Sequence, residues 1–188
     1  MDLRFEREPM LTSIALSDFN TDIFDLFDRD WFLLTSGDLQ AGSFNCMTIS
    51  WGSLGTIWNR PFAQVAVRPT RHTFGFIDRY PDFSLCAFSE EYRPALQLLG
   101  AKSGRDGDKI KESGLTPIAS AKITAPAYAE ASLVIECRKL YAQDLDPKNF
   151  IDPAIMNSYP KQDFHRVYFG EILEIRGTGR YTRQDGHA

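Results

Sequence analysis

The spacing of short apolar runs is the feature of this sequence that most constrains its fold. About seven such runs follow one another, most of them ended by Gly, Pro or Ser, and stretches with helical periodicity are few. Strands at such intervals favour a β-barrel or sandwich over a doubly wound sheet. Gly52 and Gly55 are expected to form one of the turns. The expected strands are residues 31–36, 45–51, 62–67, 83–88, 118–124, 132–141 and 164–175.

The sequence also predicts a few short helices around the strands. Asn20 or Thr21 is expected to cap the first of them. Another is expected over residues 91–99, where Gly100 would stop it. A last short helix is expected near residues 153–158, inside a long excursion rich in Asp, Asn and Pro.

Length and composition indicate a soluble globular protein. The 188 residues, 43% hydrophobic and 24% charged, are enough to bury a proper core. We expect a single domain over residues 1–188, with an N-terminal arm and short helix in residues 1–30 and a polar tail in residues 177–188. The 14 Phe, 7 Tyr and 3 Trp suit a β-rich core and can also wall a pocket for a flat ligand.

Charge and motif content disfavour several classes of function. A net charge of -4 and a pI near 5.4 argue against nucleic-acid binding. No apolar run approaches the ~18 residues of a membrane span, and the N-terminus lacks an apolar signal-peptide core. No GxxxxGK[ST], HExxH or GxSxG motif and no Rossmann fingerprint occurs, and His72, His165 and His187 are too scattered to suggest a metal cluster. We therefore expect no nucleic acid, no membrane and no metal.

The three cysteines, Cys46, Cys86 and Cys137, lie far apart with no CxxC pair. This spacing suggests neither a disulfide framework nor a zinc site, and it fits a reducing cytoplasm. Each cysteine is expected to be a small buried hydrophobic residue, and the protein to be cytoplasmic.

The strand over residues 45–51 has two different faces. Its side chains alternate between an apolar set and a set of small hydroxyl and thiol groups that includes Thr48 and Ser50. Such a face could meet a ligand. The alternative is an edge strand whose Thr and Ser merely suit β geometry.

Phosphate-binding groups follow the strand over residues 62–67. They are Arg68, Pro69, Thr70, Arg71, His72 and Thr73. The proline ends the strand, and one of the two threonines is expected to cap a helix that runs to about Tyr80. A helix N-terminus offers unpaired N–H groups, and the two arginines can fork onto phosphate oxygens. The alternative is that these arginines pair with acids such as Asp78 or Asp82.

Five segments, in order along the chain, together resemble the flavin reductase-like family with the FMN-binding split-barrel fold, especially its flavoredoxin-like branch. They are residues 45–52, 58–61, 67–73 and 103–109, and a closing segment with Tyr159-Pro160, Asp163, His165 and residues 168–172. The resemblance covers about residues 30–176. His72 departs from the family pattern, in which an aromatic such as Tyr is expected.

The resemblance implies a mainly β fold, a six-stranded antiparallel split β-barrel with a few short peripheral helices. It also implies a homodimer that holds FMN noncovalently near the subunit interface. The ribityl chain and ring would meet Asn45, Met47, Thr48, Ile49 and Ser50. The phosphate would meet Arg68, Pro69, Thr70, Arg71 and Thr73. The polar loop over residues 102–109, which composition alone makes a solvated connector, would be a lid; Ser89, Ser103, Arg105 and Lys109 would also contact the flavin.

The function implied by the resemblance is that of an FMN-binding oxidoreductase of the flavin reductase type. It would pass electrons from NAD(P)H or a small redox protein through FMN to an acceptor, with no catalytic acid or base because the flavin carries the chemistry. His165 would either position a nicotinamide or be a satisfied core histidine. The alternatives are an FMN-binding electron carrier or sensor domain without direct NAD(P)H turnover, and a structural β-domain.

Overall fold

The strands of the computed structural model form one large antiparallel sheet and one small one, and the structure describes residues 10–183. The strands of the large sheet are β1 (Thr12–Ser13), β2 (Phe32–Asp38), β3 (Ser43–Ile49), β4 (Gly52–Ile57), β5 (Arg60–Val67), β6 (Asp82–Ala87), β9 (Leu133–Asp144) and β10 (Arg166–Gly177). The small sheet pairs β7 (Pro117–Ile118) with β8 (Ala127–Tyr128). The predicted mainly β architecture is confirmed, although the large sheet has eight strands rather than six.

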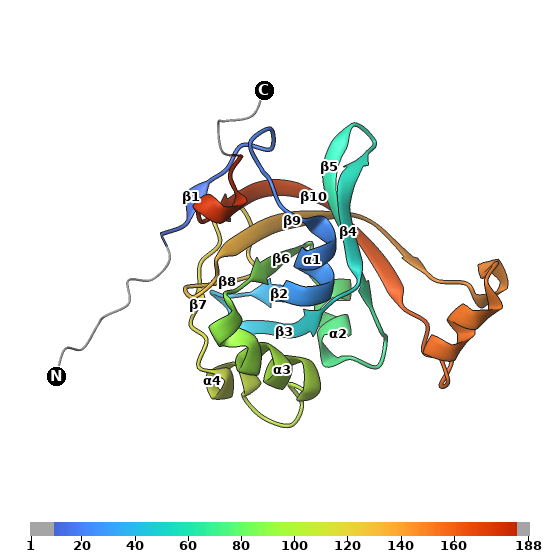
Figure 1. The fold of residues 1–188 in the computed structure, drawn as a ribbon. Coiled ribbons are helices and arrows are strands. Elements are labelled where there is room, and N and C mark those ends of the chain that lie inside the picture. The colour runs from blue at the N-terminus through green and yellow to red at the C-terminus, as the bar shows by residue number, and fades with distance from the viewer. Residues whose placement is uncertain (1–9, 184–188) are drawn as a thin grey trace.

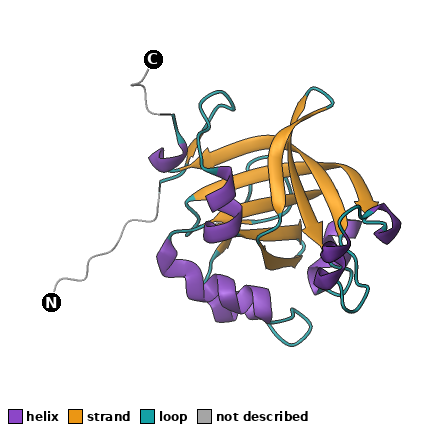
Figure 2. Cartoon of the chain, turned by 45° about the vertical axis from the view of Figure 1, so that its right-hand side comes forward, coloured by secondary structure: helices purple, strands orange, loops and turns teal. Residues whose placement is uncertain are grey.

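The large sheet curves into a barrel that stays open between two of its strands (Figure 2). Its order is β3-β2-β6-β9-β10-β5-β4, with β1 added to β10, so β3 and β4 are the two ends of the path. These strands are consecutive in the chain, and only Ser50 and Trp51 separate them. The candidate site described below lies along this opening.

The turn between β4 and β5 is not where the glycines predicted it. Gly52 and Gly55 lie inside β4, and the chain reverses at Trp58 and Asn59, which have φ of 52° and 56°. Positive φ at both central residues is the mark of a two-residue type I′ hairpin, in which Asn-Gly is the usual pair. Because the pair here is Trp-Asn and contains no glycine, the sequence did not indicate a turn at this position.

The strand predicted over residues 118–124 is largely absent. Only Pro117–Ile118 is a strand, and a loop leads from it to β8. Buried carboxylates hold this loop: Glu136 accepts from the backbone N–H groups of Ala121 and Lys122 at 2.8 and 2.7 Å, and Asp82 accepts from that of Ala125 at 3.1 Å. Side chains distant in sequence therefore replace the ladder partner that a strand would need.

The helices are short and lie around the barrel (Figures 1 and 2). They are α1 (Ile23–Asp25), the π-helix η1 (Leu26–Asp30), α2 (His72–Arg79), α3 (Arg93–Ala101), α4 (Lys109–Ser113), and the 3-10 turns η2 (Glu90–Tyr92), η3 (Pro147–Asn149), η4 (Pro153–Ser158) and η5 (Gly179–Tyr181). Asp22, not Asn20 or Thr21, caps the first helix, accepting from Phe24 and Asp25. The predicted helix over residues 91–99 is η2 followed by α3, and it continues one residue past Gly100.

The core has two parts because strands of the sheet are buried on both faces. Phe32 and Leu34 of β2 point into the barrel, whereas Leu33 packs with Cys46, Leu96 and Leu99 under α3. A strand buried on both faces reads as a continuous apolar run. The same packing buries all three cysteines, as predicted, and burial raises the pKa of the Cys46 thiol to about 11.

Both ends of the described chain pack against β10 or the barrel. Thr12–Ser13 pairs with β10, and Ile14 is buried. The polar tail was predicted to start at residue 177, but Gly177 still belongs to β10 and Tyr181 is buried. Residues 1–9 and 184–188, and with them much of the predicted arm and tail, lie outside the described residues. The segment between β9 and β10, residues 145–165, projects away from the barrel (Figure 1).

Candidate functional site

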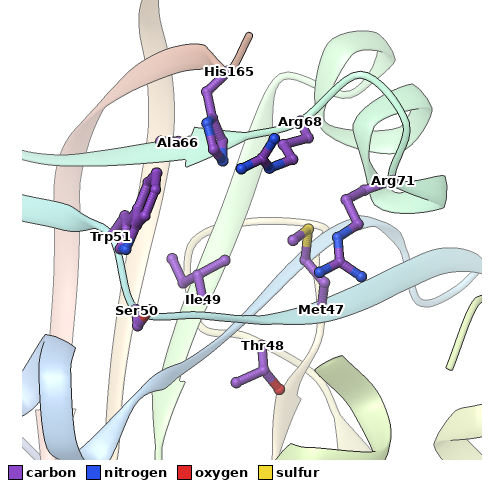
Figure 3. A pocket seen from close by; sticks show the side chains of 9 residues that line it. All are labelled: Met47, Thr48, Ile49, Ser50, Trp51, Ala66, Arg68, Arg71 and His165. Carbon is purple, nitrogen blue, oxygen red and sulfur yellow. The ribbon is translucent and has the colours of Figure 1, made fainter. Parts of the chain in front are cut away.

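Arg71 lines four cavities, and three of them form the candidate site beside the end of β3. The Arg68 cavity, about 250 Å³, is lined by Met47, Thr48, Ile49, Ser50, Trp51, Ala66, Arg68, Arg71 and His165 (Figure 3). The loop cavity, about 130 Å³, is lined by Met47, Thr70, Arg71, His72, Thr73, Leu99, Ala101, Lys102, Ser103, Gly104, Arg105 and Lys109. The Trp31 cavity, about 290 Å³, is lined by Trp31, Thr48, Ile49, Ser50, Arg71, Leu96, Gln97 and Gly100.

These cavities gather most of the residues that the sequence predicted. Three predicted residues do not line them: Asn45, Pro69 and Ser89. Asn45 is buried behind the loop cavity, and Pro69 lines a neighbouring hollow beside α2. Ser89 is exposed and donates to the Glu91 carboxylate at 2.6 Å. The structure therefore does not bring Ser89 to the site.

Strand β3 turns its apolar face, not its hydroxyl face, toward the arginines. Met47 and Ile49 point into the Arg68 cavity, whereas Thr48 and Ser50 point to the other side of the strand (Figure 3). The Thr48 hydroxyl donates to the Leu96 carbonyl of α3 at 2.6 Å. The Thr48 hydroxyl proton is therefore already used in a hydrogen bond within the protein. The polar groups that this strand leaves for a ligand are largely those of its backbone.

The two arginines have different partners. Arg68 pairs with Asp163 at 2.7 Å and donates to the Ser158 carbonyl at 2.8 Å. Both partners lie in the projecting segment, so this arginine is held by that segment. Arg71 donates to the Gly100 carbonyl at 2.9 Å and, among residues 10–183, forms no ion pair with a carboxylate. The predicted alternative partners are wrong, since Asp78 pairs with Arg166 and Asp82 holds the loop before β8.

The first turn of α2 is open toward the loop cavity. Arg71 occupies the N-cap position, and no side chain caps the helix, contrary to the prediction of Thr70 or Thr73. The Thr73 hydroxyl instead donates to the Cys46 carbonyl at 3.0 Å and accepts from the Asn45 amide at 2.7 Å. Uncapped N–H groups at a helix N-terminus, next to unpaired cations, form a site for an anion.

The loop over residues 102–109 closes this site with two more cations. The Lys109 ammonium is buried and donates to the carbonyls of Leu99 and Lys102 at 2.9 and 3.1 Å. Burial and then the nearby Arg71 lower the pKa of Lys109. Arg105 donates only weakly to the Thr70 carbonyl, at 3.5 Å, and has no carboxylate partner in the described chain.

Gly104 allows this loop to approach β3 closely. A Cβ at this position would lie 2.3 Å from Asn45 Oδ1 and 2.9 Å from His72 Cδ2. The pKa of His72 is lowered by burial and then by Arg105 and Lys109. His72 thus lines the loop cavity with its neutral form favoured, and it adds hydrogen-bonding capacity rather than charge.

The sequence singled out His165 but did not indicate the cluster that the projecting segment forms around it at the Arg68 cavity. His165 is buried, its Nδ1 lies 2.8 Å from the Tyr159 hydroxyl, and its ring centroid is 5.0 Å from that of Trp51. Burial, then Arg68, lowers the pKa of His165 to about 4, so the ring is neutral at pH 7. His165 is a packed histidine that also forms part of the cavity wall, and its role toward a nicotinamide stays a prediction.

Two kinds of feature are not found in the described part of the chain. Residues 10–183 contain no group of three or more His, Cys, Asp or Glu side chains placed to hold a metal ion. No helix in the same residues is long and apolar enough to cross a membrane. His187 lies outside these residues.

One family model matches most of the chain. Residues 25–181 match the family model described as "Flavin reductase like domain". An uncharacterized protein from Pyrococcus abyssi is 28% identical over 141 residues, which are 74% of this chain and 78% of that protein.

Solved structures share the fold at low sequence identity. An FMN-binding domain of a flavin reductases-like enzyme from Shewanella baltica has a TM-score of 0.65 at 17% identity, covering 90% of this chain and 78% of that one. Flavoredoxin of Desulfovibrio vulgaris has a TM-score of 0.64 at 20% identity, covering 93% of this chain and 81% of that one. At such identities the likeness shows the split-barrel fold.

Proposed function

This chain belongs to the flavin reductase like family, and from that premise we propose that it is an FMN-binding oxidoreductase. It passes electrons from NAD(P)H or a small redox protein through bound FMN to an acceptor. Structural neighbours that are FMN-binding proteins support the flavin, and the geometry of the Arg68 cavity and the loop cavity supports its placement.

The observation that carries the proposal is a cluster of cations in an acidic protein. The chain has a net charge of -4, yet Arg71, Arg105 and Lys109 converge on the loop cavity beside the uncapped first turn of α2. Cations without carboxylate partners gain most from an anion such as a phosphate monoester, which accepts charge-assisted hydrogen bonds. The residues present therefore fit the FMN phosphate.

The remaining parts of FMN fit the neighbouring Arg68 cavity. The backbone from Met47 to Ser50, at the end of β3, borders the Arg68 cavity and would run along the ribityl chain and ring. The bound flavin supplies the hydride and electron chemistry. Neutral His165 and Trp51 border the Arg68 cavity, where they would shape access for the electron donor and exclude water.

The absorption spectrum of the purified protein tests FMN binding. We expect a flavin spectrum, or its appearance on titration with FMN, and bleaching by a chemical reductant. A protein that stays colourless and shows no affinity for FMN would refute the proposal.

Stopped-flow mixing tests the electron donor separately. Rapid bleaching of the bound flavin by NADH or NADPH supports a direct reductase. A flavin that stays oxidised with both nucleotides contradicts direct NAD(P)H use and leaves either a small redox protein as the electron donor or the alternative of a carrier or sensor domain.

We also propose that the protein is a homodimer. The projecting segment exposes Ile151 fully, at 99%, and partly exposes Ile155 and Met156. Apolar side chains on a protruding segment favour burial against a second copy. Light scattering after size-exclusion chromatography should give twice the 21.3 kDa chain mass, and replacing these three residues by Ser should shift the mass toward the monomer. A monomeric parent would contradict the proposal.

A further inference from the structure

The backbone of Trp31 is held in a conformation that tryptophan seldom adopts. Its φ of 63° and ψ of 157° fall in a region populated almost only by glycine. It directly follows the π-helix η1, and π-helical turns are rare and occur frequently at functional sites. Strain of this kind persists only where the surrounding structure holds it.

Two contacts fix the Trp31 indole before any ligand arrives. Its N–H donates to the Asp28 carbonyl at 3.0 Å, and the Arg93 guanidinium lies over the ring, 4.3 Å from its centre. Arg93 is itself anchored on the Arg29 carbonyl. The indole remains partly exposed and forms a wall of the Trp31 cavity. A rigid aromatic wall recognises a flat ring at little cost in conformational entropy.

The rest of the Trp31 cavity is apolar on one side and cationic at its end. The buried Leu96 supplies apolar surface from α3, whereas the Ile49 side chain points into the Arg68 cavity. Arg71 closes the end that this cavity shares with the Arg68 and loop cavities, and within the described residues its guanidinium donates to the Gly100 carbonyl. A guanidinium has five N–H donors, so Arg71 can serve a phosphate on one side and a second anion on the other.

We propose that the Trp31 cavity is a second ligand site, distinct from the FMN site, for a small planar aromatic molecule that carries a carboxylate. The ring packs against the fixed indole of Trp31 and the side chain of Leu96, and the carboxylate meets Arg71. The volume of about 290 Å³ suits a molecule of one ring. The site goes beyond the proposed FMN chemistry, and its test does not require the flavin.

Calorimetric titration with benzoate tests the site, on the full chain with and without added FMN. We expect saturable binding to one site in both forms, and binding about tenfold weaker for cyclohexanecarboxylate, which has the same charge but no aromatic ring. No saturable binding of benzoate, or equal binding of the two acids, would overturn the proposal.

Trp31→Gly is the sharpest variant, because glycine adopts the observed φ without strain while the indole is lost. We expect it to lower benzoate affinity at least about tenfold and to leave FMN affinity within about twofold. Trp58→Gly is the matched control, since Trp58 is also a tryptophan at positive φ, 55% exposed on the β4–β5 hairpin. It should leave benzoate binding unchanged.

Gln97→Trp blocks the cavity from its exposed rim and covers the case in which Trp31→Gly fails to fold. It should abolish benzoate binding while the flavin still binds. If either variant lowers FMN affinity as much as benzoate affinity, the cavity holds the flavin ring and the second site is refuted. FMN titration alone decides the proposed function, so the two failures are distinguishable.

Discussion

The amide of Asn45 donates a hydrogen bond to the Thr73 hydroxyl across 2.7 Å, and both side chains are buried. The same hydroxyl donates to the Cys46 carbonyl at 3.0 Å. These bonds fasten the first turn of α2 to the middle of β3, 28 residues earlier in the chain. They set the distance between the cation cluster at Arg71 and the strand that would carry the ribityl chain.

Thr73→Val should therefore destabilise the protein. Valine keeps the shape but leaves the buried Asn45 amide with only a long bond to the Cys46 carbonyl, at 3.3 Å, at a cost of about 1–3 kcal/mol. Urea denaturation measures the change in the free energy of unfolding. Thr70→Val, at an exposed position three residues earlier, should change it by no more than about 0.5 kcal/mol. Equal stabilities of the two variants would contradict the role of this bond.

Arg71→Ala should weaken FMN binding. A charge-assisted contact contributes about 1.5–3 kcal/mol, which corresponds to about 10- to 150-fold in the dissociation constant. Fluorescence titration with FMN measures it. Arg138→Ala removes the same charge from an exposed position on β9 and should leave the constant nearly unchanged. Equal losses in both variants would mean that net charge, not contact, governs binding.

Gly104→Ala should weaken FMN binding with little loss of global stability. The added Cβ would collide with Asn45 Oδ1 and His72 Cδ2, so the loop over residues 102–109 must move outward and carry Arg105 with it. Gly75→Ala is the matched control, because a Cβ there meets nothing within 4 Å and the position is inside α2. It should stabilise the protein by about 0.5–1 kcal/mol without changing FMN affinity. Unchanged affinity in Gly104→Ala would show that the loop does not contact the ligand.

His165 should make the protein less stable as the pH falls from about 6.5 to about 4. Its pKa is about 4 in the folded chain and about 6.5 when unfolded, so the unfolded state binds more protons within this window. Above pH 6.5 both states are neutral and the effect is absent. His165→Asn, which keeps a hydrogen-bonding atom near Tyr159, should flatten the difference in unfolding free energy between pH 7 and pH 4.5. An unchanged pH profile in this variant would contradict the assignment to His165.

The fold was largely predictable because strand signals are local. The continuous apolar run at residues 31–36 and the alternation at residues 132–141 identify β2 and β9 without any knowledge of their neighbours. The failures occurred where tertiary partners replaced local signals. Glu136 and Asp82 hold a loop where a strand was expected, and Trp58-Asn59 forms a turn that has no glycine.

The residues of the candidate site likewise divide into those that local sequence signals indicated and those that only tertiary contacts brought together. Residues 68–73 are contiguous, so the sequence by itself determined that two arginines would stand at the start of a helix and that this helix would follow a strand. The resemblance to a known family added the expectation that the loop over residues 102–109 contacts the ligand and that this ligand is a flavin. Nothing local showed that the Thr48 hydroxyl would be committed to Leu96, or that Ser89 would lie elsewhere.

Only the tertiary structure decided what surrounds Arg71. Lys109 reaches it because α3 packs against β3 and α4 packs against α3, and His165 reaches the adjoining cavity because β10 pairs with β5 in one particular register. The strained backbone of Trp31 is likewise imposed by its surroundings, since local preference alone would put glycine there. Sequence patterns report periodicity and local chemistry, whereas the meeting of groups far apart in the chain depends on sheet register and helix packing, which no single segment encodes.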